Sequence, residues 1–204
     1  MPIKHCKTCF KILKSEDLYE IFNGDSCICS TCQQKLAPRF ERFEIEVVNG
    51  LAIYDYDDNI KSLLYQFKGC YDIELANVFL NRFKKELRLM YRNYIILPAP
   101  SYYLDDEKRG FKHVNKIFEV LNLPIVNVFS KIAPFKQAEH SKKDRSKIGD
   151  YLVLDKPNEI TNKNVLIVDD VCTTGATLKA LVKLVKTAKP RKIKILVMAK
   201  RLMH

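Results

Sequence analysis

Apolar positions in the first half of the chain predict a β-hairpin followed by two helices. The apolar residues between positions 47 and 54 flank the turn-forming pair Asn49-Gly50, so we expect a hairpin there. Apolar residues over 60–67 recur at helix spacing and stop at Gly69, and those over 73–87 repeat the pattern with lysine and arginine opposite. These apolar faces are predicted to form core, and we assign no chemistry to them.

The second half of the chain alternates short apolar runs with helical segments. The runs cover residues 94–97, 125–129, 165–168 and 193–199 and are rich in β-branched residues. This alternation predicts an α/β fold with a mostly parallel sheet and helices on both faces. In such sheets ligands bind in the loops after the carboxyl ends of the strands, so we expect the functional residues there.

Composition and charge divide the chain into unequal parts. With 204 residues, 47% of them apolar, it can bury one medium-sized core, and its cysteine-rich start predicts a small appendage. We expect a knuckle over residues 1–45 and a main domain over residues 46–204. The formal charge is +11, and residues 151–204 hold eleven lysines and arginines against four acidic residues, which favours a polyanionic partner.

Several classes of protein are excluded by patterns that the chain lacks. Its six glycines are all more than ten residues apart, so neither the GxGxxG dinucleotide loop nor the GxxxxGK[ST] phosphate loop can occur. Its apolar runs are far shorter than a membrane span, and the first residues resemble no signal peptide. We therefore expect a cytoplasmic protein without membrane insertion.

Two CxxC pairs near the N-terminus predict a metal site. They consist of Cys6, Cys9, Cys29 and Cys32, with nineteen residues between the pairs. Each pair directs two thiolates toward one centre, and two pairs form the closed tetrahedral site that structural Zn2+ prefers. Cys27 is an alternative third ligand to Cys29, which we prefer for its CxxC spacing. Free thiols or a redox pair are the alternative to metal.

Residues 164–178 form the most informative stretch of the chain. A buried strand leads into two carboxylates, then into a turn of small hydroxyl residues with one glycine, and then into a helix. The candidate ligand-binding residues are Asp169, Asp170, Val171, Cys172, Thr173, Thr174, Gly175, Ala176 and Thr177. Backbone N–H groups at the helix start and the threonine hydroxyls form a cradle for phosphate, which the glycine lets approach closely.

The two carboxylates suit a sugar phosphate better than a bare phosphate, which they would repel. They can accept hydrogen bonds from vicinal ribose hydroxyls, or hold them through Mg2+, while the cradle binds the 5′-phosphate. The stretch closely resembles the phosphoribosyl pyrophosphate (PRPP) signature of type I phosphoribosyltransferases. A Walker B-like strand is the alternative, but its partner loop is missing.

Other motifs agree with this resemblance and extend it over the whole chain. A Pro-Ala-Pro-Ser loop at 98–101 follows a predicted strand, and an Arg-Gly-Phe triplet lies at 109–111. The basic run 137–147 is suited to a mobile lid or, alternatively, to a solvated loop. Together with the double CxxC these motifs resemble the ComF/GntX family of competence-associated phosphoribosyltransferase-like proteins. Lys112-His113 stand where that family usually has Asn-Gln.

The resemblance implies a type I phosphoribosyltransferase fold, a Mg2+-dependent PRPP site and a role in DNA uptake during natural transformation. Single-stranded DNA, a competence helicase and recombination-mediator proteins are the partners it implies. It assigns ribose 5-phosphate to residues 169–177. It assigns pyrophosphate to Ala99, Pro100, Ser101, Arg109 and Arg145. Asp169, Asp170 and Arg109 are the candidate catalytic residues.

Two functions remain open at this point. One is a phosphoribosyltransferase acting on a nucleobase or another small acceptor, for which the sequence identifies no acceptor site. The other is a binding protein that keeps the PRPP site and contacts single-stranded DNA. Lys179, Lys183 and Lys186 share one helix face, and with Lys192 they are candidate contacts to a nucleic-acid backbone. An ordinary solvated helix face is the alternative.

Overall fold

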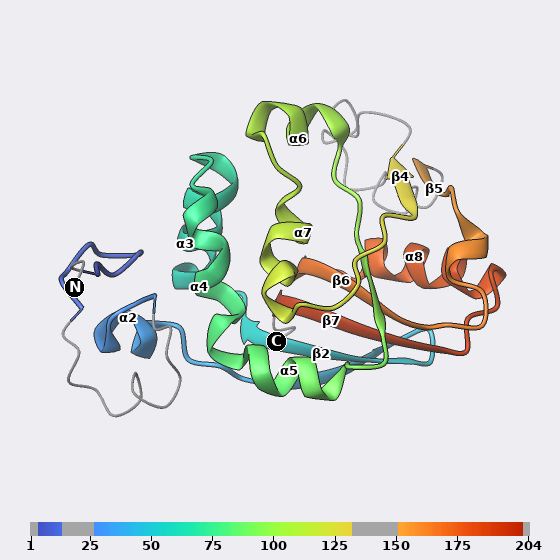
Figure 1. Ribbon diagram of the computed structural model, residues 1–204, viewed down its shortest axis with the longest axis horizontal. Helices are drawn as coiled ribbons and strands as arrows, with labels where there is room; N and C mark the ends of the chain where they lie inside the picture. Colours follow the sequence, from blue (N-terminus) through green and yellow to red (C-terminus); the bar gives the residue numbers. More distant parts are fainter. Residues whose placement is uncertain (1–3, 14–26, 132–150, 202–204) are drawn as a thin grey trace.

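A five-stranded sheet forms the centre of the protein in a computed structural model that describes residues 4–13, 27–131 and 151–201 (Figure 1). Its strands are β1 (Glu41–Ile45), β2 (Val48–Asp55), β3 (Ile95–Pro98), β6 (Asn164–Cys172) and β7 (Lys192–Lys200). The strand order is β1-β2-β7-β6-β3. Only β1 is antiparallel to its neighbour, and the other strands run parallel. A separate antiparallel pair consists of β4 (Phe129–Lys131) and β5 (Leu152–Leu154).

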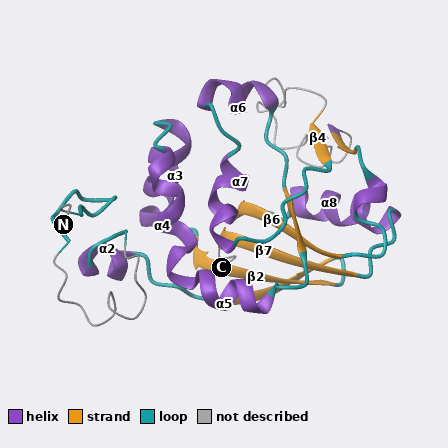
Figure 2. Cartoon of the chain, in the orientation of Figure 1, coloured by secondary structure: helices purple, strands orange, loops and turns teal. Residues whose placement is uncertain are grey.

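Helices cover both faces of the sheet (Figure 2). The helices of the described residues are α2 (Ser30–Lys35), in the N-terminal segment, and α3 (Asp58–Gly69), α4 (Ala76–Leu80), α5 (Lys84–Met90), α6 (Tyr103–Arg109), α7 (His113–Phe118) and α8 (Ala176–Thr187). Short 3-10 turns lie at Ile73–Leu75, Asn81–Phe83, Glu119–Leu121 and Pro157–Glu159. Helix α8 packs on one face, and α3, α4, α5 and α7 pack on the other.

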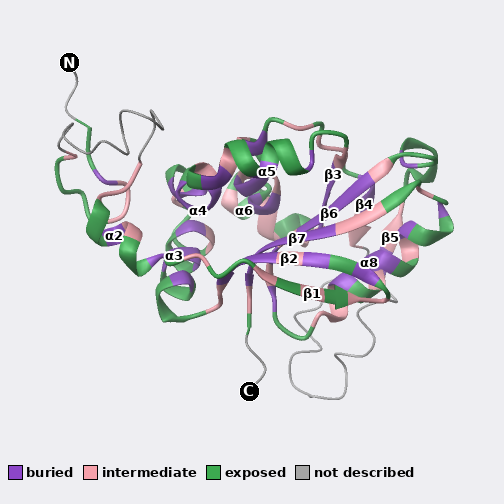
Figure 3. Ribbon diagram, turned by 90° about the horizontal axis from the view of Figure 1, so that it is seen from below, coloured by how far each residue is buried: buried purple, intermediate pink, exposed green. Residues whose placement is uncertain are grey.

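The strand β6 shows why the sheet lies between two layers. Val165 and Ile167 belong to the core under α8, whereas Leu166 and Val168 belong to the core under the other helices. All four are fully buried, and Figure 3 shows β6 and β7 as largely buried strands. A strand buried on both faces has no polar side, which explains its continuous apolar run. The prediction of a mostly parallel α/β fold with helices on both faces is confirmed.

The predicted hairpin forms, but its turn is not at Asn49-Gly50. The chain reverses at Glu46 and Val47, whose φ angles are 51° and 64°, and Asn49 and Gly50 lie inside β2. Gly50 pairs with Phe43 across the hairpin, and a Cβ at Gly50 would lie 2.4 Å from Cζ of the Phe43 ring. The glycine therefore leaves room for a cross-strand aromatic ring rather than for a turn.

Two other elements differ from the sequence-based expectation. The single helix expected over 73–87 is divided into two 3-10 turns and the helices α4 and α5, with φ near −123° at Leu80 and −113° at Phe83. The run 125–129 gives one isolated bridge, between Ile125 and Ile96, and only its last residue starts β4. Most of the apolar residues of these segments are nevertheless buried or half-buried, with Ile73 as an exposed exception, because their spacing still directs them to the core.

The N-terminal segment packs against the main body beside α3. Lys7 Nζ lies 2.7 Å from Glu74 Oε2, and Leu36 is buried in the core that α3 and α4 share. Strand β1, which ends at Ile45, already belongs to the central sheet. The boundary between residues 45 and 46 stays a prediction. Among the described residues, no helix combines the length and apolarity that crossing a bilayer requires.

Candidate functional site

The carboxyl ends of the parallel strands meet at one edge of the sheet, and the two aspartates lie there. Backbone hydrogen bonds connect the segments that leave these ends: the Ala99 N–H donates to the Val168 carbonyl at 2.8 Å, and the Arg201 N–H donates to the Cys172 carbonyl at 2.9 Å. The predicted ribose loop and the predicted pyrophosphate loop are therefore neighbours in space, although about 70 residues separate them along the chain.

Asp170 is the most strongly held polar residue of this edge. It is buried, and its Oδ2 contacts Lys68 Nζ and lies 3.2 Å from His113 Nε2. Its Oδ1 accepts a hydrogen bond from the Val171 N–H at 2.6 Å. Burial would raise the pKa of Asp170, but the Lys68 ammonium and the His113 ring outweigh it and hold that pKa below its ordinary value.

Asp169 differs from its neighbour because no cationic side chain of the described residues forms an ion pair with it. Its Oδ1 accepts the Asp170 N–H at 2.9 Å, and the side chain is half-buried. Burial, followed by repulsion from Asp170, raises the pKa of Asp169 to about 8. Asp170 is thus a carboxylate whose charge Lys68 and His113 balance, whereas Asp169 is a carboxyl without such a partner among the described residues. Such a carboxyl suits a hydroxyl donor or a cation.

The loop after β6 has the backbone geometry of an anion cradle. Gly175 has a φ of 74°, and a Cβ there would lie 3.1 Å from Ile45 Cδ1, so both its conformation and its surroundings favour glycine. Helix α8 begins at Ala176, whose N–H donates to Thr174 Oγ1 at 3.4 Å, and the N–H groups of Thr177 and Leu178, next in the first turn, can face a ligand. Thr173 and Thr174 are exposed beside these groups.

The remaining loop residues differ in what they can offer. Cys172 is buried, and burial raises the pKa of its thiol to about 11, so only its backbone can serve a ligand. Val171, Ala176 and Thr177 are half-buried. Among the predicted side-chain contacts of the loop, the threonine hydroxyls are therefore the available ones.

A cavity of about 280 Å3 lies beside the Pro-Ala-Pro-Ser loop after β3. Ala99, Pro100 and Ser101 line it, together with the cationic side chains Lys112 and Lys131. Its size and its two lysines suit a small polyanion such as pyrophosphate. The three loop residues predicted to face pyrophosphate thus line a common cavity.

Arg109 does not line this cavity. Its guanidinium donates to Asp106 Oδ1 at 2.9 Å and lies 3.1 Å from His113 Nδ1, and only 10% of the side chain is exposed. Ser101 Oγ also donates to Asp106 Oδ1, at 2.6 Å. A continuous hydrogen-bonded chain therefore links the loop after β3, through Arg109 and His113, to Asp170. Arg145 and the predicted lid at 137–147 lie outside the described residues.

Four functional side chains escaped the sequence analysis: Lys68, Lys112, His113 and Lys131. Lys68 ends α3 and has the pattern of an ordinary basic residue in a last helical turn, so nothing in the sequence indicates its contact with Asp170. His113 offered a signal, because Lys112-His113 follow the Arg-Gly-Phe triplet where the family pattern has Asn-Gln.

The cysteines of the two CxxC pairs converge at the N-terminal end of the protein. The Sγ atoms of Cys6, Cys9, Cys29 and Cys32 all lie within 4.8 Å of one another, and those of Cys9 and Cys29 are 3.6 Å apart. A tetrahedral zinc with Zn–S bonds of about 2.3 Å places its sulfurs about 3.8 Å apart, so the four thiols can hold such an ion. Cys27 is not part of this cluster and packs against the core.

Backbone groups favour the thiolate of one ligand, Cys6, whereas burial and the neighbouring thiols raise the pKa of Cys32. Burial would raise the pKa of the Cys6 thiol, but hydrogen bonds from the backbone of Cys29, Cys9 and Thr8 lower it to about 6. A thiolate is the form that binds metal.

The lysines of α8 gather around the β1–β2 turn. Lys179 Nζ lies 3.0 Å from Glu46 Oε1, and Lys186 Nζ donates to the Glu46 carbonyl at 2.8 Å. The hydrogen bond from Lys179, with the nearby Lys183 and Lys186 charges, lowers the pKa of Glu46. The three lysines therefore do share one face, and an acidic residue lies among them. Lys192 is exposed at the start of β7.

Comparison with known protein families finds a match for the C-terminal part of the chain. Residues 107–203 match the phosphoribosyl transferase domain family. The match begins within α6 and covers the whole double-aspartate loop, α8 and β7.

Two curated relatives are both described as Competence protein ComFC. The protein from Bacillus subtilis (strain 168) is 29% identical over 129 residues, which span 62% of this chain and 53% of the relative. The protein from Streptococcus pneumoniae (strain ATCC BAA-255 / R6) is 25% identical over 218 aligned positions, covering 93% of this chain and 96% of the relative. Among solved structures, a hypoxanthine phosphoribosyltransferase from Staphylococcus aureus aligns with a TM-score of 0.40 and 17% identity, covering 61% of this chain and 62% of its own.

Proposed function

We propose that this chain, a member of the ComF family of phosphoribosyltransferase-fold proteins, binds PRPP. In this proposal PRPP binds together with Mg2+ at the β6–α8 loop. One observation carries the proposal: two adjacent carboxyls near the end of β6 lie a few residues before a helix start that follows a glycine in the left-handed conformation. Phosphate suits the helix start and ribose hydroxyls suit the carboxyls, so the loop matches a sugar phosphate as a unit.

Each part of the edge has a role in this proposal. The backbone of residues 173–177 and the hydroxyls of Thr173 and Thr174 bind the 5′-phosphate, and Asp169 accepts from the ribose hydroxyls. The cavity beside Ser101, with Lys112 and Lys131, holds the pyrophosphate. Arg109 and His113 act as positioning residues, because they connect that cavity to Asp170 without lining it.

The donor set also suits the proposed metal ions. Carboxylate oxygens are the ligands that Mg2+ prefers, and Asp169 lies where the ribose hydroxyls and the ion would meet. When bound, Mg2+ neutralises charge on the pyrophosphate group. For the N-terminal thiols we propose structural Zn2+, because four convergent sulfurs leave no open position for catalysis.

PRPP binding can be tested by calorimetry on the full chain with Mg2+. We expect Asp169→Asn to weaken PRPP binding about 10- to 100-fold, because the amide has one acceptor oxygen instead of two and cannot take the charged form that Mg2+ would stabilise. The fold should persist, since Asp170 keeps its contacts to Lys68 and His113. Glu86→Ala removes an exposed carboxylate on α5 and serves as the control. Failure of the unaltered protein to bind PRPP would refute the proposal.

A role in DNA uptake is the wider proposal, and it draws on the name of the relatives, Competence protein ComFC. In this role the protein is cytoplasmic, contacts single-stranded DNA through the α8 lysines, and works with a competence helicase and recombination mediators. The gathering of Lys179, Lys183 and Lys186 on one face supports the contact, and Glu46 weakens it by neutralising part of their charge.

The DNA contact predicts a steep salt dependence that specific lysines control. Reversing two charges in Lys179→Glu/Lys183→Glu should weaken oligo-dT binding and reduce the slope of log K against log salt by about 2. Fluorescence anisotropy at several salt concentrations measures both quantities. Lys85→Glu/Arg88→Glu on α5 is the matched control. Equal losses in the two double variants would mean that net charge alone, and not the α8 face, controls binding.

A second candidate function is an active phosphoribosyltransferase without direct DNA binding. In that reaction a nitrogen lone pair of the acceptor bonds to C1′ of PRPP, and the C1′–O bond breaks with its electron pair leaving on pyrophosphate. The N–H proton of the acceptor passes to water. This alternative requires an acceptor site beside Asp169 and Asp170, and a cavity at that position favours it.

A further inference from the structure

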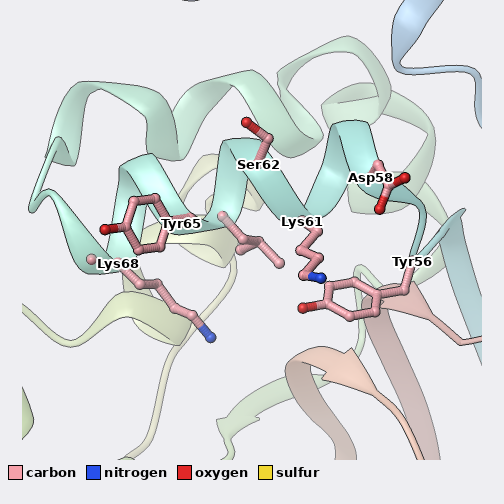
Figure 4. Close-up of a pocket in the computed structure, with 8 residues that line it drawn as sticks. Tyr56, Asp58, Lys61, Ser62, Tyr65 and Lys68 are labelled. Carbon is pink, nitrogen blue, oxygen red and sulfur yellow. The ribbon is translucent and has the colours of Figure 1, made fainter.

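A second cavity, of about 600 Å3, lies under α3 at the same edge of the sheet. Tyr65, Lys61 and Lys68 line it from α3, and Tyr56 lines it from the segment after β2. In Figure 4, Lys61 and Lys68 extend from the helix toward the space that the Tyr56 hydroxyl also enters, whereas Ser62 points away. Two ammonium groups and a phenol hydroxyl therefore converge on one space, and the carboxylate of Asp58, at the start of α3, lines its end beside Tyr56.

This cavity adjoins the double-aspartate site. Lys68 lines the cavity, and its ammonium contacts Asp170. The Tyr56 N–H donates to the Lys200 carbonyl at 2.8 Å, at the end of β7, the strand directly beside β6. The cavity thus lies on the β2 side of the aspartates, whereas the cavity lined by Ser101 lies on the β3 side. A ribose held at the aspartates would have one cavity on either side.

The lining of this cavity suits a flat ring that carries a negative charge. Tyr65 is 69% exposed and Leu64 is buried behind it, so an aromatic face and an apolar wall are both available. Within the described part of the chain Lys61 is ion-paired with no carboxylate, whereas Lys68 is paired with Asp170. An unpaired ammonium beside aromatic surface favours an aromatic acid over a neutral ring.

We propose that the cavity under α3 is the acceptor subsite, and that its ligand is a planar aromatic carboxylate with a nucleophilic N–H. The proposal rests on the proposed PRPP site. The ring packs against Tyr65, the carboxylate meets Lys61 and the Tyr56 hydroxyl, and the nitrogen faces C1′ of the ribose. The nitrogen bonds to C1′, the C1′–O bond breaks, pyrophosphate leaves with the electron pair, and the N–H proton passes to water.

Binding to the full chain tests this inference, with orotate and anthranilate as aromatic acids and hypoxanthine and adenine as neutral rings. Each is titrated in the presence of Mg2+ and PRPP, and release of pyrophosphate is followed. We expect at least one acid to bind, and Lys61→Met and Tyr65→Ala each to weaken it about tenfold. Tyr65→Phe should retain most of the affinity. Tyr71→Ala, which removes a half-exposed ring outside the cavity, is the matched control.

The outcomes separate this inference from the proposal on which it rests. If the unaltered protein binds no PRPP, the proposed function itself is wrong. If PRPP binds but neither acid does, or if Lys61→Met and Tyr65→Ala leave acid binding unchanged, the acceptor subsite is wrong. Preference for hypoxanthine or adenine overturns the anionic acceptor, and displacement of a bound acid by oligo-dT would assign the cavity to nucleic acid instead.

Discussion

Cys29→Ser should abolish the proposed zinc binding and unfold the N-terminal segment. Cys29 is one of four thiols within 4.8 Å of one another, and removal of one ligand opens a site that a structural metal needs closed. A segment this small forms little core of its own, so metal binding, worth about 10–16 kcal/mol for small zinc modules, is most of its folding free energy. Metal content by mass spectrometry and limited proteolysis measure the loss.

Cys27→Ser provides a matched control for this experiment. Cys27 lies only two residues from Cys29 but outside the sulfur cluster, so this variant should retain one zinc per chain and the protease resistance of the unaltered protein. The central sheet should survive in both variants, because its core lies under other helices. Loss of zinc in Cys27→Ser but not in Cys29→Ser would show that Cys27 and not Cys29 completes the site.

Asp170→Ala should have the second largest effect, and it acts on stability before any ligand is added. The substitution removes the carboxylate that Lys68 and His113 contact. Removing one partner of a fully buried pair costs about 3–5 kcal/mol. Because Lys68 keeps 33% of its side chain exposed, we expect a smaller loss, about 2–4 kcal/mol, at pH 7. Urea unfolding in the presence of a chelator measures it.

The pH dependence of this loss follows from the lowered pKa of Asp170. A carboxyl whose pKa is lower in the folded state stabilises the protein above its unfolded pKa, near 4, and loses that contribution as the pH falls. The difference in unfolding free energy between the unaltered protein and Asp170→Ala should therefore have its largest value at pH 7 and become smaller below about pH 4.

Lys68→Met separates the charge network from simple loss of volume. In this variant Asp170 keeps His113 and the Val171 N–H as partners, so we expect a smaller loss than in Asp170→Ala. A stability of Asp170→Ala equal to that of the unaltered protein at pH 7 would contradict a structural role for the network.

Much of the candidate site was predictable because its residues are contiguous or regularly spaced. The β6–α8 loop holds the carboxyls, the hydroxyls and Gly175 within seven residues, and a buried strand before them positions the loop at the sheet edge. The cysteine cluster was predictable for a similar reason, because a CxxC turn brings two thiols together locally and the duplicated spacing indicates a second pair.

The sequence was less informative where a residue acts through a distant partner. Gly50 was assigned to a turn from its neighbour Asn49, but it lies opposite the Phe43 ring in a strand. The α8 lysines were correctly placed on one face, but that face also includes Glu46, more than 130 residues earlier in the chain. Side-chain identity and spacing describe a single element, and they carry no information about what packs against it.

By itself the sequence determined the parallel α/β fold, the four-thiol cluster and the order of chemical groups in the double-aspartate loop, because each depends on local spacing and on burial of apolar runs. Only the tertiary structure decided how the two aspartates differ. Lys68 and His113 lie 102 and 57 positions before Asp170 and meet it only once α3 and α7 pack on the sheet. That packing places a cation on one carboxyl and none on its neighbour, and charge balance in a buried site is a property of the folded neighbourhood.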